Sequence, residues 1–283
     1  MYESMNTPAA IFAGMNLTFQ LESPKVAFYR YGIGDIPLVL LHGFCEDQSV
    51  WAPVLPYLND LPLLLIDLPG FGQSDKAEAP SIQAYAAAVK AVLENQGISS
   101  CVLVGHSMGG YVALEFAAHW PEYLAGLGLF HSHPFTDNEE RKTARKRGIE
   151  TLLAGKRDLY VSQLFPNLFS PAFQASRPGI IQSLTDNGKQ QSTDAIIHAL
   201  QAMLDRQDHQ RTLAALPCPS LFLLGQKDTL IPYDQGIQAG LLPDKSLIEL
   251  LPEAGHMAMW EETDLCCSLL ARFYQWCLNE NRR

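Results

Sequence analysis

Gly105-His106-Ser107-Met108-Gly109 is the stretch of this sequence that decides the fold. The residues before it, Cys101-Val102-Leu103-Val104, form a short apolar run that is typical of a buried strand. After it, apolar residues recur at helical spacing until Pro121, which ends such a pattern. A strand that turns at once into a helix crowds its backbone, and glycine two positions before and after the turning serine relieves this crowding. The stretch therefore predicts a strand–turn–helix unit with the Ser107 hydroxyl exposed at the carboxyl end of the strand.

The length and composition indicate one large domain that has room for an insertion. The chain has 283 residues, 47% of them hydrophobic, and a formal net charge of −10. A field of that sign repels nucleic acid and anionic membrane surfaces, and no apolar run approaches the ~20 residues that span a bilayer. Residues 1–12 contain no Lys or Arg and lack the form of a secretory signal. We therefore expect a cytoplasmic protein without nucleic-acid or membrane partners, while its oligomeric state stays open.

The cysteines predict neither disulfides nor a zinc site. None of them forms a C-x-x-C motif or another paired spacing that such sites use. Buried or partly buried thiols in a reducing compartment fit the sequence better, and we expect no metal. The six cysteines are Cys45, Cys101, Cys218, Cys266, Cys267 and Cys277.

Strand-like and helix-like segments alternate along most of the chain. Continuous apolar runs such as 38–41 and 63–66 suit strands that are covered on both faces in a parallel sheet. The segments 17–21 and 26–31 suggest an opening antiparallel pair around the turn Ser23-Pro24. We predict an α/β fold with a mostly parallel central sheet and helices on both faces. The further predicted strands are 101–104, 124–130, 219–224 and 247–251.

Two more helices have recognisable limits or faces in the sequence. One lies between Ser81, which can cap its amino end, and Gly97, which stops it. The other closes the chain after the last strand. Its predicted apolar side consists of Leu265, Leu269, Phe273 and Trp276.

The alternation stops between His133 and Ala214, where no convincing strand occurs. Asp137 and Glu140 have capping-box spacing at the start of one helix, and apolar residues recur at helical spacing over 196–204. We interpret this segment as a helical cap inserted between two halves of the core. The predicted parts are a core of residues 1–132 and 215–283 and a cap of residues 133–214.

The second half of the chain offers the two partners that a serine nucleophile needs. A hydroxyl becomes nucleophilic when a histidine removes its proton and a carboxylate orients that histidine. Asp228 follows the predicted strand 219–224, and His256 follows the strand 247–251. Loops at the carboxyl ends of parallel strands share one edge of the sheet, so Ser107, Asp228 and His256 are expected to converge there as a catalytic triad.

The developing oxyanion of such a reaction needs backbone donors. The N–H of Met108 stands at the start of the helix after the nucleophile, where one donor is expected. The N–H of Phe44 is the second candidate, because Gly43 lets the loop after the strand 38–41 turn inward. No step of this chemistry requires a cofactor.

Together these motifs resemble those of the α/β-hydrolase superfamily, in its cap-bearing esterase-like branch. The resemblance covers residues 16–276 apart from the cap, and it implies the α/β-hydrolase fold with the triad and oxyanion donors named above. A serine nucleophile separates the chain from the haloalkane dehalogenases and epoxide hydrolases of this superfamily, which use aspartate. The motifs are Leu41-His42-Gly43-Phe44, Asp67-Leu68-Pro69-Gly70-Phe71-Gly72-Gln73-Ser74, Gly105-His106-Ser107-Met108-Gly109-Gly110, Gly225-Gln226-Lys227-Asp228 and Gly255-His256.

Simpler roles compete with some of these assignments. Ser107 could stand in a structural or anion-binding turn, Asp228 could cap a helix, and His256 could be an ordinary loop histidine. Two further histidines, His131 and His133, lie just past the strand 124–130, where they could line the pocket or support it.

The cap carries two features that bear on the substrate. His133, Phe169 and Phe173 are expected to line the substrate pocket, with a plain cap core as the alternative for the phenylalanines. The basic run of residues 141–147 could meet an acidic carrier protein or a carboxylated substrate, or form a solvated face paired with acidic neighbours.

The sequence thus predicts a cofactor-independent serine hydrolase that cleaves a small-molecule carboxylic ester, thioester or lactone through an acyl-enzyme. A carbon–carbon bond hydrolase or lyase of the same fold is the enzymatic alternative. A non-catalytic ligand receptor is the alternative from another class. Such receptors commonly lose a member of the triad, and this sequence retains all three.

Overall fold

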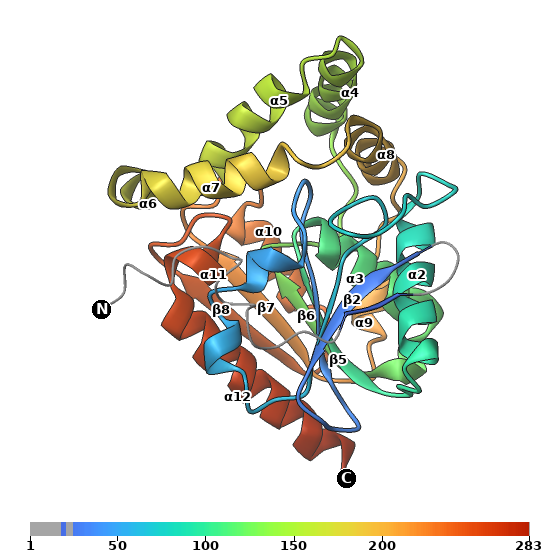
Figure 1. The fold of residues 1–283 in the computed structure, drawn as a ribbon. Coiled ribbons are helices and arrows are strands. Elements are labelled where there is room, and N and C mark those ends of the chain that lie inside the picture. Colours follow the sequence, from blue (N-terminus) through green and yellow to red (C-terminus); the bar gives the residue numbers. More distant parts are fainter. Residues whose placement is uncertain (1–17, 21–24, 283) are drawn as a thin grey trace.

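The computed structural model describes residues 18–20 and 25–282, which build one eight-stranded sheet with helices around it (Figure 1). The strand order is β1-β2-β4-β3-β5-β6-β7-β8. Strand β2 pairs antiparallel with both of its neighbours, and every pair from β4 to β8 is parallel. The strands are β1 (Thr18–Gln20), β2 (Ala27–Tyr31), β3 (Leu38–Leu41), β4 (Leu63–Ile66), β5 (Cys101–His106), β6 (Leu124–Phe130), β7 (Ser220–Gly225) and β8 (Ser246–Leu251).

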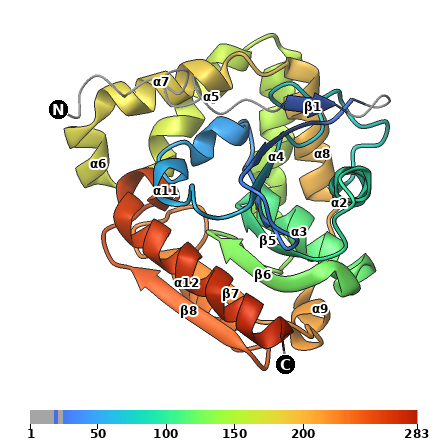
Figure 2. The same ribbon diagram turned by 60° about the horizontal axis from the view of Figure 1, so that its bottom comes forward.

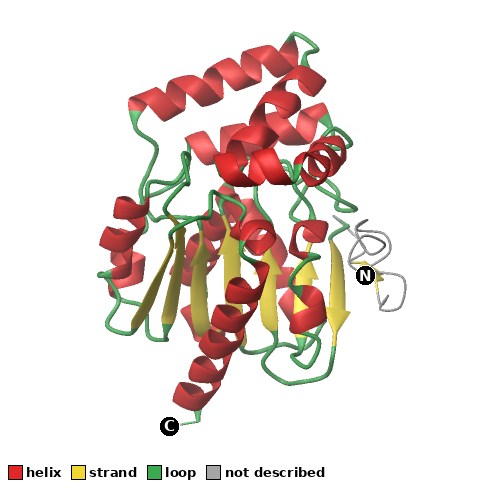
Figure 3. Ribbon diagram, turned by 90° about the vertical axis from the view of Figure 1, so that its left-hand side faces the viewer, coloured by secondary structure: helices red, strands yellow, loops and turns green. Residues whose placement is uncertain are grey.

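The apolar runs of the sequence form the inner strands. Every residue of β3 to β7 is buried, because helices cover both faces of a parallel sheet. Helices α2 (Ile82–Asn95) and α3 (Met108–His119) lie on the far side of the sheet from α12 (Thr263–Asn281), which runs in front of the strands in Figure 3. The predicted mostly parallel sheet and the opening antiparallel pair are confirmed. The predicted turn Ser23-Pro24 lies outside the described residues.

The capping prediction for α2 is confirmed, whereas the apolar side predicted for α12 needs a correction. The Ser81 side chain accepts the N–H of Ala84 at the start of α2. In α12, Leu269 and Phe273 are buried, but Leu265 is 44% exposed. The buried stripe runs through cysteines beside these residues, and a pattern of large apolar residues alone does not reveal it. Its members include Cys266, Leu269, Leu270, Phe273 and Cys277.

All six cysteines are buried free thiols. Within the described residues, no helix combines the length and the apolar character that crossing a membrane requires.

Residues 133–214, all of which are described, form helices and connecting segments without a strand. Helices α4 to α8 make a layer above the sheet edge at which β6 ends, whereas α9 lies beside α3 (Figures 1 and 2). An ion pair joins α9 to the core, because His209 Nε2 lies 2.9 Å from Glu115 Oε2 of α3. The helices are α4 (Glu139–Leu153), α5 (Arg157–Leu164), α6 (Pro171–Ser176), α7 (Pro178–Gly188), α8 (Thr193–Leu204) and α9 (Gln210–Ala214).

The predicted capping role of Asp137 is wrong. Asn138 is the N-cap of α4, and its side chain accepts the N–H of Arg141. The buried carboxylate of Asp137 instead binds the guanidinium groups of Arg145 and Arg206. Arg206 lies 69 positions away in the sequence, so the spacing around Asp137 cannot show this interaction.

Candidate active site

Ser107 occupies a strained turn between β5 and α3. Its backbone angles are φ +50° and ψ −114°. Residues other than glycine rarely adopt this backbone conformation, and proteins retain it mainly where the surrounding structure enforces it. The flanking glycines are required here. A Cβ on Gly105 would overlap the carbonyl of Gly109, and one on Gly109 would lie 2.6 Å from the carbonyl oxygen of His42. The predicted strand–turn–helix unit is therefore confirmed.

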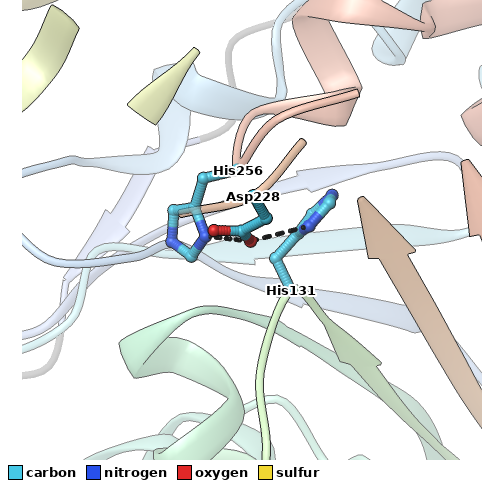
Figure 4. A group of neighbouring side chains, drawn as sticks. All are labelled: His131, Asp228 and His256. Carbon is cyan, nitrogen blue, oxygen red and sulfur yellow. Dashed lines mark hydrogen bonds and ion pairs between the residues drawn. The ribbon is translucent and has the colours of Figure 1, made fainter. Parts of the chain in front are cut away.

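Asp228 and His256 meet beyond the ends of β7 and β8. Nδ1 of His256 donates to Oδ2 of Asp228 over 2.7 Å (Figure 4). The other carboxylate oxygen accepts the backbone N–H groups of Leu230 and Ile231. Because Nδ1 carries the proton of the neutral ring, Nε2 of His256 is left as the basic nitrogen. The pair thus has the tautomer that general-base chemistry needs.

A second histidine, His131, binds the same carboxylate from the opposite side (Figure 4). It follows β6 with φ +49°, and its Nδ1 lies 3.2 Å from Oδ2 of Asp228. Burial lowers the pKa of His131 to about 4, although the Asp228 charge opposes this shift. The ring is therefore neutral near pH 7 and donates from Nδ1, while Nε2 is buried without a partner. The sequence shows that His131 follows the strand 124–130, but it does not show the hydrogen bond from His131 to Asp228.

The two histidines keep Asp228 ionised. Burial alone would raise the pKa of this carboxyl, but its electrostatic attraction to His256 and its hydrogen bonds with His131 and His256 hold it well below its usual range. His131, Asp228 and His256 have side chains of the kind that bind metals, with ligand atoms within 4.8 Å of one another. The protons on both Nδ1 atoms already bond to the carboxylate, so hydrogen bonding accounts for this cluster without a cation.

The sequence predicts two backbone amides, those of Met108 and Phe44, as the donors of an oxyanion hole. Met108 is the first residue of α3, and Phe44 lies on the loop after β3. In the described part of the chain, neither N–H has an acceptor among the hydrogen bonds. The neighbouring amide of Gly43 is occupied, because it donates to Oε2 of Glu46 over 2.7 Å.

Ser107, His256 and Phe44 line one cavity of about 560 Å³ between the sheet edge and the helical layer. Its walls are mainly apolar and come from both sides. Helices α4, α5 and α8, together with the 3₁₀ helix of residues 165–168, supply one wall, and the loop after Asp228 supplies the other. The apolar lining residues include Leu164, Leu168, Leu200 and Met203 of the helical layer and Leu230, Ile231 and Pro232 of the core.

The three residues that the sequence suggested for the pocket are not among those lining this cavity. His133 is buried beside Tyr111, with ring centroids 5.7 Å apart. Phe169 and Phe173 stack on each other, with centroids 5.1 Å apart. Their segment docks on the His256 loop, because Leu168 accepts the N–H of His256 over 2.7 Å. Backbone contacts between distant segments, rather than side-chain character, thus decide which residues face the cavity.

The basic run divides between the cavity and the surface. Arg141 and Arg145 line the cavity, whereas Lys142 pairs with Glu139 on the exposed side of α4. Arg145 is neutralised by Asp137, but Arg141 has no carboxylate partner among the ion pairs of the described residues. A terminal nitrogen of its guanidinium group lies 3.5 Å from Nε2 of His133. One end of the cavity therefore presents a guanidinium group that is available to a ligand.

The chain matches the model of the alpha/beta hydrolase family over residues 38–268. It is 29% identical over 247 residues to the biotin biosynthesis bifunctional protein BioHC of Cellvibrio japonicus, covering 84% of this chain but 47% of that protein. The chain thus spans about half the length of that relative. It is 26% identical to the 2-hydroxy-6-oxononadienedioate/2-hydroxy-6-oxononatrienedioate hydrolase of Burkholderia vietnamiensis, covering 92% of this chain and 94% of that enzyme.

A thermophilic esterase from Thermogutta terrifontis has a similar structure, with a TM-score of 0.86 and 26% identity over 93% of this chain and 99% of the esterase. The family model covers most of the chain, so the chain belongs to the alpha/beta hydrolase family and has its fold.

Proposed function

We propose that the chain is a serine hydrolase in which Ser107 is the nucleophile, His256 the general base and Asp228 the residue that orients His256. The observation that carries this proposal is the cavity that Ser107 and His256 share, with His256 held in the required tautomer by Asp228. Hydrogen bonds to a catalytic serine are often long without substrate, so the shared cavity and the tautomer are the relevant geometric features.

The reaction follows from these groups. Ser107 Oγ attacks the carbonyl carbon of the substrate while its proton moves to Nε2 of His256, and the carbonyl electrons become an oxyanion. The amides of Phe44 and Met108 stabilise that charge. The imidazolium then gives its proton to the leaving group, which departs as an alcohol or thiol. Water attacks the acyl-enzyme by the same route and releases the carboxylic acid and free Ser107.

The substrate class that fits this cavity is a small carboxylic ester, thioester or lactone. About 560 Å³ with mainly apolar walls suits a small acyl group. The similar fold of the Thermogutta esterase supports this class without fixing the substrate.

A panel of p-nitrophenyl esters of graded chain length, with lactones and thioesters, tests the proposal. We expect turnover of at least one short ester by the wild type and none above background by Ser107→Ala. Equal turnover by a folded Ser107→Ala protein would overturn the assignment of the nucleophile.

A carbon–carbon bond hydrolase acting on a carboxylated substrate is the second candidate. The unpaired guanidinium of Arg141 in the cavity favours it, because arginine binds carboxylates through charge-assisted hydrogen bonds. The related Burkholderia enzyme is named as a hydrolase of dioates, which are dicarboxylates.

The two candidates differ in their dependence on Arg141. If a substrate carboxylate binds there, Arg141→Gln should lower kcat/KM for an anionic substrate by about 10- to 100-fold, the range of a hydrogen bond to a charged group. A neutral ester should lose little. Arg147→Gln, on the exposed part of the same helix, is the matched control. Equal effects on both substrates would remove the support for this candidate.

A further inference from the structure

Glu46 and His106 form a buried pair at the point where three loops of the site meet. Nδ1 of His106 lies 3.1 Å from Oε2 of Glu46, and Nε2 lies 2.9 Å from the backbone carbonyl oxygen of His256. The same carboxylate oxygen accepts the N–H of Gly43 over 2.7 Å. Through these bonds the two side chains connect the backbone of the Gly43–Phe44 loop, the turn at Ser107 and the backbone of the His256 loop.

The partners of His106 decide its protonation state. The carbonyl oxygen of His256 can only accept, so Nε2 of His106 must carry a proton. Nδ1 faces a carboxylate that also accepts a backbone N–H, an arrangement that suits an ionised Glu46. An imidazole that donates from both nitrogens is a cation. The geometry thus describes an imidazolium beside a carboxylate.

The titratable groups around the pair come from four segments. His42 and Asp47 lie on the loop after β3, His131 follows β6, Asp228 follows β7 and His256 follows β8. Burial disfavours charge on both members, but their mutual attraction raises the pKa of His106 and, with help from His42, lowers that of Glu46. Aromatic rings enclose the imidazole, with centroids of Trp51 at 6.3 Å and Phe130 at 6.0 Å.

We propose that Glu46 and His106 are positioning residues that hold the Gly43–Phe44 loop and the His256 loop in catalytic register as a permanently charged pair. A neutral His106 could not donate both of its hydrogen bonds, to Glu46 and to the carbonyl of His256. With its proton on Nδ1, the lone pair of Nε2 would face the carbonyl of His256. With its proton on Nε2, Nδ1 would face a carboxylate oxygen. The effect on catalysis rests on the function proposed above, whereas the charge state of the pair does not.

The charge state is measured on the wild-type protein without substrate. With ¹⁵N-labelled histidine, and with the ring signals of His106 assigned through its backbone, NMR should show an imidazolium from pH 6 to pH 9. A His106 ring that is neutral at pH 7, or that titrates within this range, would overturn the proposal. This experiment is independent of folding changes in any variant.

The positioning role is tested with Glu46→Gln, which keeps the shape of the side chain and removes its charge. Its His106 lacks a counter-ion and should lose its proton as the pH rises. We expect kcat/KM to fall by about 10²-fold relative to the wild type at pH 8, the cost of misplacing reacting groups by roughly 1 Å. The ratio of variant to wild type should recover toward one as the pH falls.

Glu115→Gln is the matched control, because Glu115 also pairs with a histidine, His209, at similar burial on the far part of α3. It should lower stability without changing the pH dependence of kcat/KM. A Glu46→Gln protein that is folded, with a pH-independent ratio of activities, would overturn the positioning role. The two proposals can fail separately. If NMR shows an imidazolium at His106 but the Ser107→Ala variant is fully active, the charged pair stands and the proposed function is overturned.

Discussion

The carboxyl edge of the sheet and the helical layer above it contribute to one cavity in different ways. At the edge, Ser107 directly follows β5, and Asp228 and His256 lie on the loops after β7 and β8, so their places depend on short motifs and on strand order. In helices α4 to α8, the residues that face the cavity depend on how the helices pack. The proposed catalytic residues thus depend mainly on local sequence, whereas the residues that line the cavity from the helical layer depend on tertiary packing.

Hydrogen bonds of the backbone join the helical layer to the His256 loop. The carbonyl of Leu168, in the helical layer, accepts the N–H of His256. Ser170 nearby donates to Glu261, whose other carboxylate oxygen accepts the N–H of Gly255. The helical layer therefore supports the His256 loop in addition to covering the cavity.

The largest expected loss of kcat follows from replacing Ser107 or His256, the proposed nucleophile and base. Ser107→Ala and His256→Ala should each lower kcat by about 10⁴- to 10⁶-fold, and the double variant should be little worse, because the two residues act as one unit. Steady-state kinetics on the best ester of the panel measures this. Losses that multiply in the double variant would mean that the residues act independently.

Asp228→Asn should be nearly as damaging, by about 10⁴-fold in kcat, because an amide no longer fixes the tautomer of His256. Circular dichroism should show an unchanged fold. His131 cannot take over the role of the Asp228 carboxylate, because its ring also donates a hydrogen bond to Asp228 and does not accept one from His256. Near-normal activity of this variant would show that a different carboxylate orients His256.

Asp137→Asn should lower the free energy of unfolding while leaving kcat nearly unchanged. The two guanidinium groups would keep a neutral partner, and breaking a buried ion pair typically costs about 3–5 kcal/mol. The arginines hold the pKa of Asp137 well below its usual range despite its burial.

A carboxyl with a depressed pKa contributes stability that is present above its unfolded pKa, about 3.9, and is lost as the pH falls further. Urea unfolding should therefore show a wild-type advantage that is constant above about pH 5 and shrinks below about pH 4. A loss of Ser107 reactivity in folded Asp137→Asn would contradict the separation of the two regions.

The smallest expected effect concerns selectivity within the helical layer. Leu164→Ala or Met203→Ala should change the ratio of kcat/KM between long and short acyl chains by about 10- to 200-fold, as expected for ~1–3 kcal/mol of hydrophobic discrimination. Phe173→Ala is the control, because Phe173 packs on Phe169 and is not among the cavity-lining residues. A larger change in the control than in Met203→Ala would mean that the cavity walls are assigned wrongly.

The sequence predicts the sheet, the turn at Ser107 and the loops that carry Asp228 and His256, because each depends on residues close together in the chain. It does not predict the bond from His131 to Asp228 or the pair of Glu46 and His106, which join residues 97 and 60 positions apart. It also suggests Phe169 and Phe173 as pocket residues, with a plain cap core as the alternative. In the structure the two rings stack on each other, and neither residue is among those that line the cavity.

Covalent labelling of Ser107 tests the central claim most directly. A serine-directed organophosphorus reagent, followed by intact-mass measurement and peptide mapping, should add one reagent group to the peptide that contains Ser107. The adduct should be absent from Ser107→Ala and should form far more slowly in His256→Ala, because the attack on phosphorus needs the same base. No adduct on the folded wild type, or an adduct on another residue that persists in Ser107→Ala, would contradict the account.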